Sequence, residues 1–225
     1  MKLKHAFTVA CIALSMANAA QAQVGFSATL GTTGAGLHLS VPLAPQLDAR
    51  FGVNGLNYSH DGNTSDVDYD LKLKMRTVDA LLDYYPMSTG FRVTGGIVYN
   101  GNKIDAEGRP GPGGTYTLNG RTYPAATVGS LNGQIDFRNI APYLGIGWGN
   151  ATSRAQEKGW GFTADLGVLF QGSPRTSLTN SGCAAPVLVC SQFAADVAAE
   201  NRSLQDEADN YKAFPVLRLG VNYRF

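Results

Sequence analysis

Charged side chains lie among the polar residues that alternate with apolar ones in several strand-like segments of this chain, and they are the first candidates for a function. Alternate residues of a β-strand point to one face, so these charges would gather opposite the apolar residues. If that face encloses a lumen, the charges either pair into a network that holds the strands together or line a narrow polar path that selects solutes. The residues are Asp70, Lys72, Lys74, Arg76, Asp79, Asp83, Arg92, Asp165 and Arg218.

A second chemistry would need a nucleophile beside a base. His38 and Ser40 share one strand face, and His60 is followed by Asp61. Residues two apart on a strand are separated by about 6.5–7 Å, which is too far for a direct nucleophile–base hydrogen bond. The sequence contains neither Gly-x-Ser-x-Gly nor Ser-x-x-Lys. We therefore do not predict an enzyme.

The first 22 residues have the order of a secretory signal peptide. Lys2 and Lys4 precede an apolar run over 6–16, and Ala20-Gln21-Ala22 forms a small-residue cleavage site. We expect cleavage after Ala22 and a single domain over 23–225. Loss of the two lysines reduces 18 basic residues to 16, against 17 acidic ones, a net charge of −1. Without a basic surplus, we predict no nucleic-acid partner.

Two cysteines, Cys183 and Cys190, remain after the predicted cleavage. In an oxidising compartment a nearby pair of this kind predicts a disulfide. Only His38 and His60 would accompany them as metal ligands, and neither lies near the pair in sequence, so we predict no metal site and no cofactor.

Most of the chain alternates with a period of two. Leu217, Leu219, Val221, Tyr223 and Phe225 are apolar, with Arg218, Gly220, Asn222 and Arg224 between them. Other segments repeat the pattern and end in turn residues. No later stretch reaches 18 continuous apolar residues, so strands rather than helices would cross a membrane. Strands are expected over 26–30, 37–41, 49–53, 69–84, 91–99, 132–148, 160–170 and 215–225.

Two changes of parity affect the strand count and the facing of the charges. The GTTGAG stretch, 31–36, fits a hairpin turn, which gives eight strands, or a bulge, which gives seven. Bacterial single-chain barrels have even numbers of strands, so we predict eight. A second change predicts a bulge near Arg76–Thr77, which would place Lys72, Lys74 and Arg76 on the inward face with Asp79 and Asp83.

Loop lengths alternate along the chain. Short turns at 42–47, 86–90 and 149–159 alternate with longer loops at 59–66, 101–131 and 172–213. The last of these loops has apolar residues at helix-like spacing from Phe193 to Tyr211. This asymmetry is typical of outer-membrane barrels, with short periplasmic turns and long external loops. Aromatic residues at the strand ends form two expected girdles, the outer one of Tyr58, Tyr69, Tyr99 and Phe170. A secreted soluble barrel is the alternative, and these girdles disfavour it.

Several segments resemble the ornithine-uptake porins, also called carbapenem-associated outer-membrane proteins. They are GTTGAG, YDL at 69–71, LNGRTY at 118–123, NIAPYLGIGWG at 139–149, DLGVLFQGSPRTSLT at 165–179 and PVLRLGVNYRF at 215–225. The resemblance implies a monomeric, eight-stranded barrel linked to entry of small, preferably basic, amino acids. The cysteine pair has no counterpart in the family pattern.

The sequence thus predicts an all-β, eight-stranded, antiparallel up-and-down transmembrane barrel with long external loops in a bacterial outer membrane. The expected function is a narrow channel for small solutes such as basic amino acids, with outer-membrane lipids and these solutes as partners. The alternative is a non-conducting structural or adhesive barrel that presents 101–131 and 172–213 outside the cell.

Overall fold

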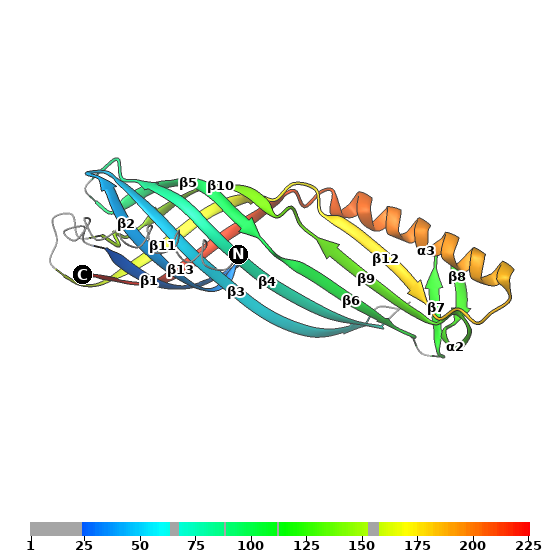
Figure 1. Ribbon diagram of the computed structural model, residues 1–225. Coiled ribbons are helices and arrows are strands. Elements are labelled where there is room, and N and C mark those ends of the chain that lie inside the picture. Colours follow the sequence, from blue (N-terminus) through cyan, green and yellow to red (C-terminus); the bar gives the residue numbers. More distant parts are fainter. Residues whose placement is uncertain (1–23, 64–67, 88, 112, 153–157) are drawn as a thin grey trace, which may run out of the picture.

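The computed structural model describes residues 24–63, 68–87, 89–111, 113–152 and 158–225. The predicted signal peptide, 1–22, lies outside these residues. Eight antiparallel strands form a closed barrel in the order β1-β2-β3-β4-β5-β10-β11-β13 and back to β1, as Figure 1 shows. They are β1 Gly25–Gly31, β2 Gly34–Ala44, β3 Leu47–Asn63, β4 Asp68–Tyr84, β5 Phe91–Asn100, β10 Ile140–Trp148, β11 Gly159–Phe170 and β13 Ala213–Arg224. The predicted eight-stranded up-and-down barrel is confirmed.

The GTTGAG stretch is a hairpin turn. β1 ends at Gly31, Thr32 and Thr33 form the turn, and β2 starts at Gly34, whose φ of +92° lies in the region that favours glycine. The two strands then pair from Gly31↔Gly34 to Gly25↔Ser40. The eight-strand interpretation of this stretch is therefore correct.

The last strand closes the barrel. β13 pairs with β1 from Gly31↔Arg218 to Gly25↔Arg224 and with β11 along its other edge. Leu217, Leu219 and Val221 are about half exposed on the outer wall, whereas Arg218 and Asn222 are buried inside. This alternation of an apolar outer face and a polar inner face is that of a barrel surrounded by lipid.

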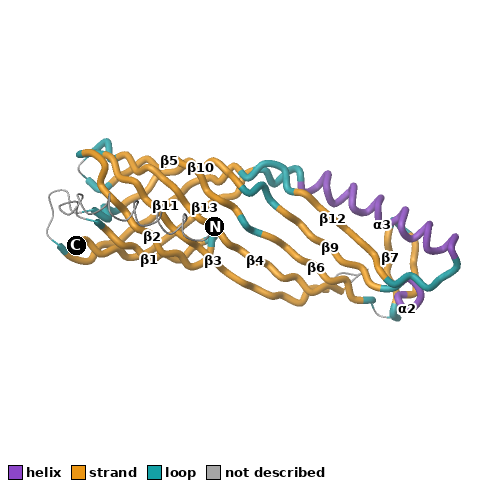
Figure 2. Tube along the Cα trace, viewed as in Figure 1, coloured by secondary structure: helices purple, strands orange, loops and turns teal. Residues whose placement is uncertain are grey.

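A second sheet region, which we call the extension, continues from one end of the barrel (Figures 1 and 2). The long hairpin β3–β4 runs past the barrel, and three further strands follow in the order β4-β6-β9-β12. Helix α3 packs along β12, and a small hairpin β7–β8 lies at the far end. The added elements are β6 Lys103–Arg109, β7 Thr115–Leu118, β8 Arg121–Pro124, α2 Ala125–Val128, β9 Ser130–Asp136, β12 Arg175–Ser181 and α3 Val187–Ala208.

The extension changes the outcome of three sequence-based predictions. The loops expected at 101–131 and 172–213 are largely folded, and α3 confirms the helical spacing seen in the second of them. The single strand expected over 132–148 is two strands, β9 in the extension and β10 in the barrel, separated by 137–139. Tyr58 is wrong as a girdle residue, because β3 continues without interruption and places it on the face opposite to Phe51 and Val53.

The bulge expected near Arg76–Thr77 is absent. Pairing between β3 and β4 runs without a register shift from Leu47↔Tyr84 to Asn63↔Asp68. The apolar residues change from one face of β4 to the other because the strand passes from the extension into the barrel. In the part that precedes Thr77, within the extension, the outer face carries Lys72 and Lys74, while the inner face carries Leu73 and Met75. The strand continues without a bulge, and its inner face becomes apolar where it leaves the barrel.

The far end of the extension has its own core. Tyr116, Leu118 and Tyr123 of the small hairpin pack with Phe193 and Val197 of α3 and with neighbouring residues Val128 and Leu131. Asp196 of α3, which is 2% exposed, accepts hydrogen bonds from Asn119, Arg121 and Tyr123. Apolar packing and one buried carboxylate thus fix the hairpin to the helix.

No helix among the described residues is long and apolar enough to cross a membrane.

Candidate functional site in the barrel interior

Four charged residues from four strands form a closed square inside the barrel. Arg50 of β3 contacts Asp83 of β4 through Nε at 2.9 Å and Asp165 of β11 through Nη1 at 2.8 Å. Arg92 of β5 contacts the same two carboxylates, Asp165 at 2.7 Å and Asp83 at 3.6 Å. Thr94 adds a hydrogen bond to Asp83 at 2.6 Å. Each carboxylate therefore lies between two guanidinium groups.

A second group lies on Asp79 of β4. Its carboxylate contacts Arg218 of β13 at 2.9 Å, His38 of β2 at 3.2 Å and the side-chain amide of Asn54 at 2.9 Å. The Arg218 guanidinium also lies over the ring of Tyr143 of β10, 5.9 Å from its centroid. We call the square and the Asp79 group together the charged layer, and its ion pairs and hydrogen bonds join six of the eight barrel strands.

The charged layer is neutral and buried. Three arginines, Arg50, Arg92 and Arg218, face three aspartates, and the exposed fraction of each of these six side chains is at most 4%. Removing charges from water is costly unless they are paired, and several contacts per carboxylate provide that compensation. The arrangement leaves no surplus charge to attract a cationic or an anionic solute.

An apolar layer inside the barrel adjoins the charged layer: Leu81 lies between Asp79 and Asp83 on β4, and Val216 precedes Arg218 on β13. Leu81, Val98, Ala141, Tyr143, Leu169 and Val216 form one buried cluster, each at most 3% exposed. Tyr143 fits because two neighbours are glycines: a Cβ added to Gly167 would lie 2.4 Å from its hydroxyl oxygen, and one added to Gly145 2.6 Å. The APYLGIG segment thus supplies both the tyrosine and one of the spaces it needs.

Five of the nine charges predicted to line a lumen lie in the charged layer: Asp79, Asp83, Arg92, Asp165 and Arg218. The other four, Asp70, Lys72, Lys74 and Arg76, lie on the opposite face of β4, so the prediction that they share a face with Asp79 is wrong. The reason is the straight register of β4 described above. Lys72 pairs with Glu107 at 2.9 Å and Lys74 with Asp105 at 2.8 Å, while Asp70 pairs with Arg109, all across the β4–β6 ladder.

Sequence reasoning missed Arg50, which contacts two of the three aspartates. The signal was present, because Arg50 lies between the outward residues Ala49 and Phe51 and so falls in the polar phase of its strand. Tyr143 was also missed. Its position beside Pro142 in an apolar strand gave no sign that its ring would meet an arginine from another strand.

The residues considered for catalysis do not form a nucleophile–base pair. His38 and Ser40 are both buried, and His38 bonds Asp79 rather than Ser40. The side chain of His60 lies outside the described residues. Within the described ranges no group of three or more His, Cys, Asp or Glu side chains is arranged to hold a metal ion. The interior can therefore act as a structural brace or as a barrier.

The predicted disulfide is confirmed. Cys183 and Cys190 are joined, with their Cα atoms 6.0 Å apart. Cys190 lies in the first turn of α3, and Cys183 packs against the far core of the extension. The bond therefore fixes the start of the helix to that core.

Comparison with known proteins gives the same fold. A crystal structure of Acinetobacter baumannii CarO2 matches with a TM-score of 0.58 and 22% identity, covering 91% of this chain and 99% of that one. A crystal structure of Acinetobacter baumannii CarO matches with a TM-score of 0.56 and 24% identity, covering 90% and 98%. No family model matches the chain, and no curated protein matches it. The resemblance seen in the sequence is thus confirmed at the level of the fold.

Proposed function

We propose that this chain is a non-conducting outer-membrane barrel that anchors the extension and displays it outside the cell. The orientation follows from the loops: the short turns, together with the paired ends of β1 and β13, would face the periplasm, and the extension would face outward. The outer wall supports a membrane location, because Leu30, Leu144, Leu166 and Leu219 are all about half or more exposed on it.

The observation that carries the proposal is the double closure of the barrel interior. A solute moving along the axis would have to pass both the apolar layer and the charged layer, which adjoin each other. The first would exclude water and ions from a constriction of buried aliphatic side chains, as in a dewetted gate. The second would require separation of ion pairs in which each aspartate contacts two cationic or polar partners.

Uptake of basic amino acids, the finer function implied by the sequence resemblance, stays a prediction. Lys72, Lys74 and Arg76, which were predicted to line the lumen, lie on the outer face of β4, so these three positive charges would not repel a cationic solute inside the barrel. The charged layer is neutral, however, and provides no surplus of carboxylates to attract such a solute. Passage would need both layers to rearrange.

Single-channel recording in planar bilayers tests the proposal, with uptake of radiolabelled arginine into liposomes as a second measurement. Wild-type protein should give no ohmic step and no uptake above that of empty liposomes, whereas an open porin in the same preparation should give both. A variant with Arg92→Gly and Leu169→Gly, which thins both layers, should conduct if it assembles. Ohmic steps from the wild type would overturn the proposal and favour the channel.

A further inference from the structure

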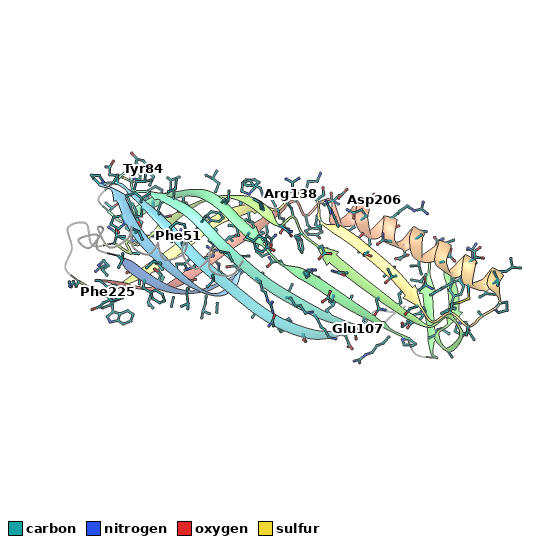
Figure 3. All side chains as sticks on the ribbon, in the orientation of Figure 1. Phe51, Tyr84, Glu107, Arg138, Asp206 and Phe225 are labelled. Carbon is teal, nitrogen blue, oxygen red and sulfur yellow. A yellow bond between two sulfur atoms is a disulfide. The ribbon has the colours of Figure 1, made fainter. Side chains whose placement is uncertain are left out.

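A cavity of about 1080 Å³ lies where the barrel meets the extension. Its lining comes from the start of β6, the β9–β10 connection, the start of β12 and α3, through Lys103, Asp136, Arg138, Ile140, Arg175 and Gln205. Figure 3 shows Arg138 at this junction. The volume is at the upper end of ligand pockets in proteins, about 300–1,000 Å³. The cavity is separate from the two layers inside the barrel.

The cavity carries an excess of positive charge. Its three cations, Lys103, Arg138 and Arg175, face one carboxylate, Asp136. Lys103 pairs with Asp136 at 3.2 Å, while Arg138 and Arg175 form no ion pair within the described part of the chain. Other cations on the same sheet face have partners: Lys72, Lys74 and Arg109 each pair with a carboxylate. Two guanidinium groups are thus left for a ligand.

The cavity opens at the level where the outer wall stops being apolar. Lys103 and Lys74 are register partners, and Lys74 lies on the face of β4 that continues the outer wall of the barrel. Ile140, which lines the cavity, is 61% exposed, and its cross-strand partner Tyr99 is 53% exposed. An exposed aliphatic residue and an aromatic residue directly below a cationic cavity mark the boundary between acyl chains and headgroups.

We propose that this cavity binds a phosphate group carried by a lipid of the outer leaflet. Guanidinium groups match phosphate oxygens with two parallel hydrogen bonds, and a phosphate monoester carries the charge needed to neutralise two arginines. The acyl chains of the same lipid would lie against the wall below, which would hold the phosphate at a high local concentration. This inference rests on the proposed location and orientation in the outer membrane, but not on the absence of conductance.

Lipid A, which carries phosphate monoesters, is the probe, and dephosphorylated lipid A is its matched control, with binding to detergent-solubilised protein followed by native mass spectrometry. The test variant is Arg138→Gln with Arg175→Gln. The control variant is Lys72→Gln with Lys74→Gln, which removes the same charge from the same sheet face. The test variant should lose at least about tenfold in affinity for lipid A, the scale of one charged hydrogen bond, and the control variant less than about twofold. Dephosphorylated lipid should bind the wild type as weakly as lipid A binds the test variant.

Three outcomes would overturn the proposal. Equal losses in the two variants would mean that general electrostatic attraction explains the binding. Equal affinity for the two lipids would mean that apolar contact explains it. Inorganic phosphate binding as tightly as lipid A would mean a site for a free anion instead of a lipid. Retention of the heat-modifiable barrel on gels confirms assembly of each variant, and Arg138→Gln alone replaces the double variant if that one does not assemble. Conductance plays no part in any of these readouts, so this test can fail or succeed independently of the proposed function.

Discussion

At the scale of single residues, individual buried aspartates connect separate strands and helices of this protein. A carboxylate offers about four acceptor positions, so one buried aspartate can satisfy donors from several elements at once. Asp165 does this for Arg50 and Arg92 in the barrel, and Asp196 does it for Asn119, Arg121 and Tyr123 in the extension. The donors to Asp165 are both arginines, whereas the Asp196 site uses three different donor types.

Acid should release the small hairpin from α3. The hydrogen bond from Tyr123, followed by those from Asn119 and Arg121, lowers the pKa of Asp196 to about 2. An unfolded aspartate has a pKa of about 3.9. Since the pKa is lower in the folded state, the stabilisation is present above pH about 4 and is lost as the pH falls towards 2. Hydrogen exchange of amides in 115–124, corrected for the intrinsic rate, should therefore accelerate between pH 5 and pH 2.

The control for this prediction is Asp196→Asn, whose hairpin should exchange faster at pH 5 and show no further acceleration at pH 2. If wild-type exchange in 115–124 is independent of pH across this range, the carboxylate does not hold the hairpin.

At the scale of elements, each barrel strand separates lipid from the charged interior. β13 shows this over its whole length, with Ala213, Leu217, Leu219 and Val221 facing outward. Because the side-chain period is two, a change of register by one residue would bring Arg218 into the lipid and Leu219 into the charged layer. The free-energy cost of a charge at an outward position then depends on how deep in the membrane that position lies.

Leu219→Arg should impair assembly of the barrel. Leu219 lies midway along β13, and a lipid-facing arginine near the bilayer midplane costs about 2–4 kcal/mol. The free energy of unfolding in lipid vesicles, from urea titration followed by tryptophan fluorescence, should fall by that amount. Ala213→Arg is the matched control, because it has the same facing at the end of the strand, where the cost is about 0–1 kcal/mol. Equal losses at the two positions would contradict the assigned membrane depth.

At the scale of the whole molecule, the barrel and the extension are joined by a few connections. The barrel closes through its own eight strands, and the ladders of β6, β9 and β12 contribute nothing to that closure. The connections also start and end close together. The backbone N–H of Asn100 bonds the carbonyl of Asn139 at 2.7 Å, and that of Gly172 bonds the carbonyl of Lys212 at 3.1 Å.

Excision of the extension should therefore leave a barrel that assembles. Replacing 102–137 and 173–211 by short glycine-containing turns removes β6 to β9, β12 and α3. The first cut ends one residue from the hydrogen-bonded pair Asn100–Asn139, and the second ends at the pair Gly172–Lys212. Heat-modifiable migration on gels and the β-sheet signal in circular dichroism should persist in the excised protein. Two further variants, one with only 102–137 replaced and one with only 173–211 replaced, test each cut separately. Loss of both signals would show that the barrel needs the extension to fold.

The sequence by itself determined the local properties of the strands. Alternation fixed which segments are strands and gave the barrel class, an even strand number selected the hairpin at 31–36, and proximity predicted the Cys183–Cys190 disulfide. The same alternation assigned Asp79, Asp83, Arg92, Asp165 and Arg218 to the polar face and could have assigned Arg50. Each of these properties depends on residues that are close together along the chain, so it can be predicted from a single sequence.

Tertiary structure alone decided where the surroundings of a strand change. In β4 the apolar residues move from one face to the other between Met75 and Val78, and the sequence cannot distinguish a bulge from a straight strand that leaves the membrane. The distinction depends on pairing with β3 and β6, because there the outer face carries lysines that pair with carboxylates of β6, while the inner face carries Met75 and Leu73. Long-range pairing likewise decided that the polar connections form a sheet, and that three arginines from three strands meet three aspartates in a closed barrel.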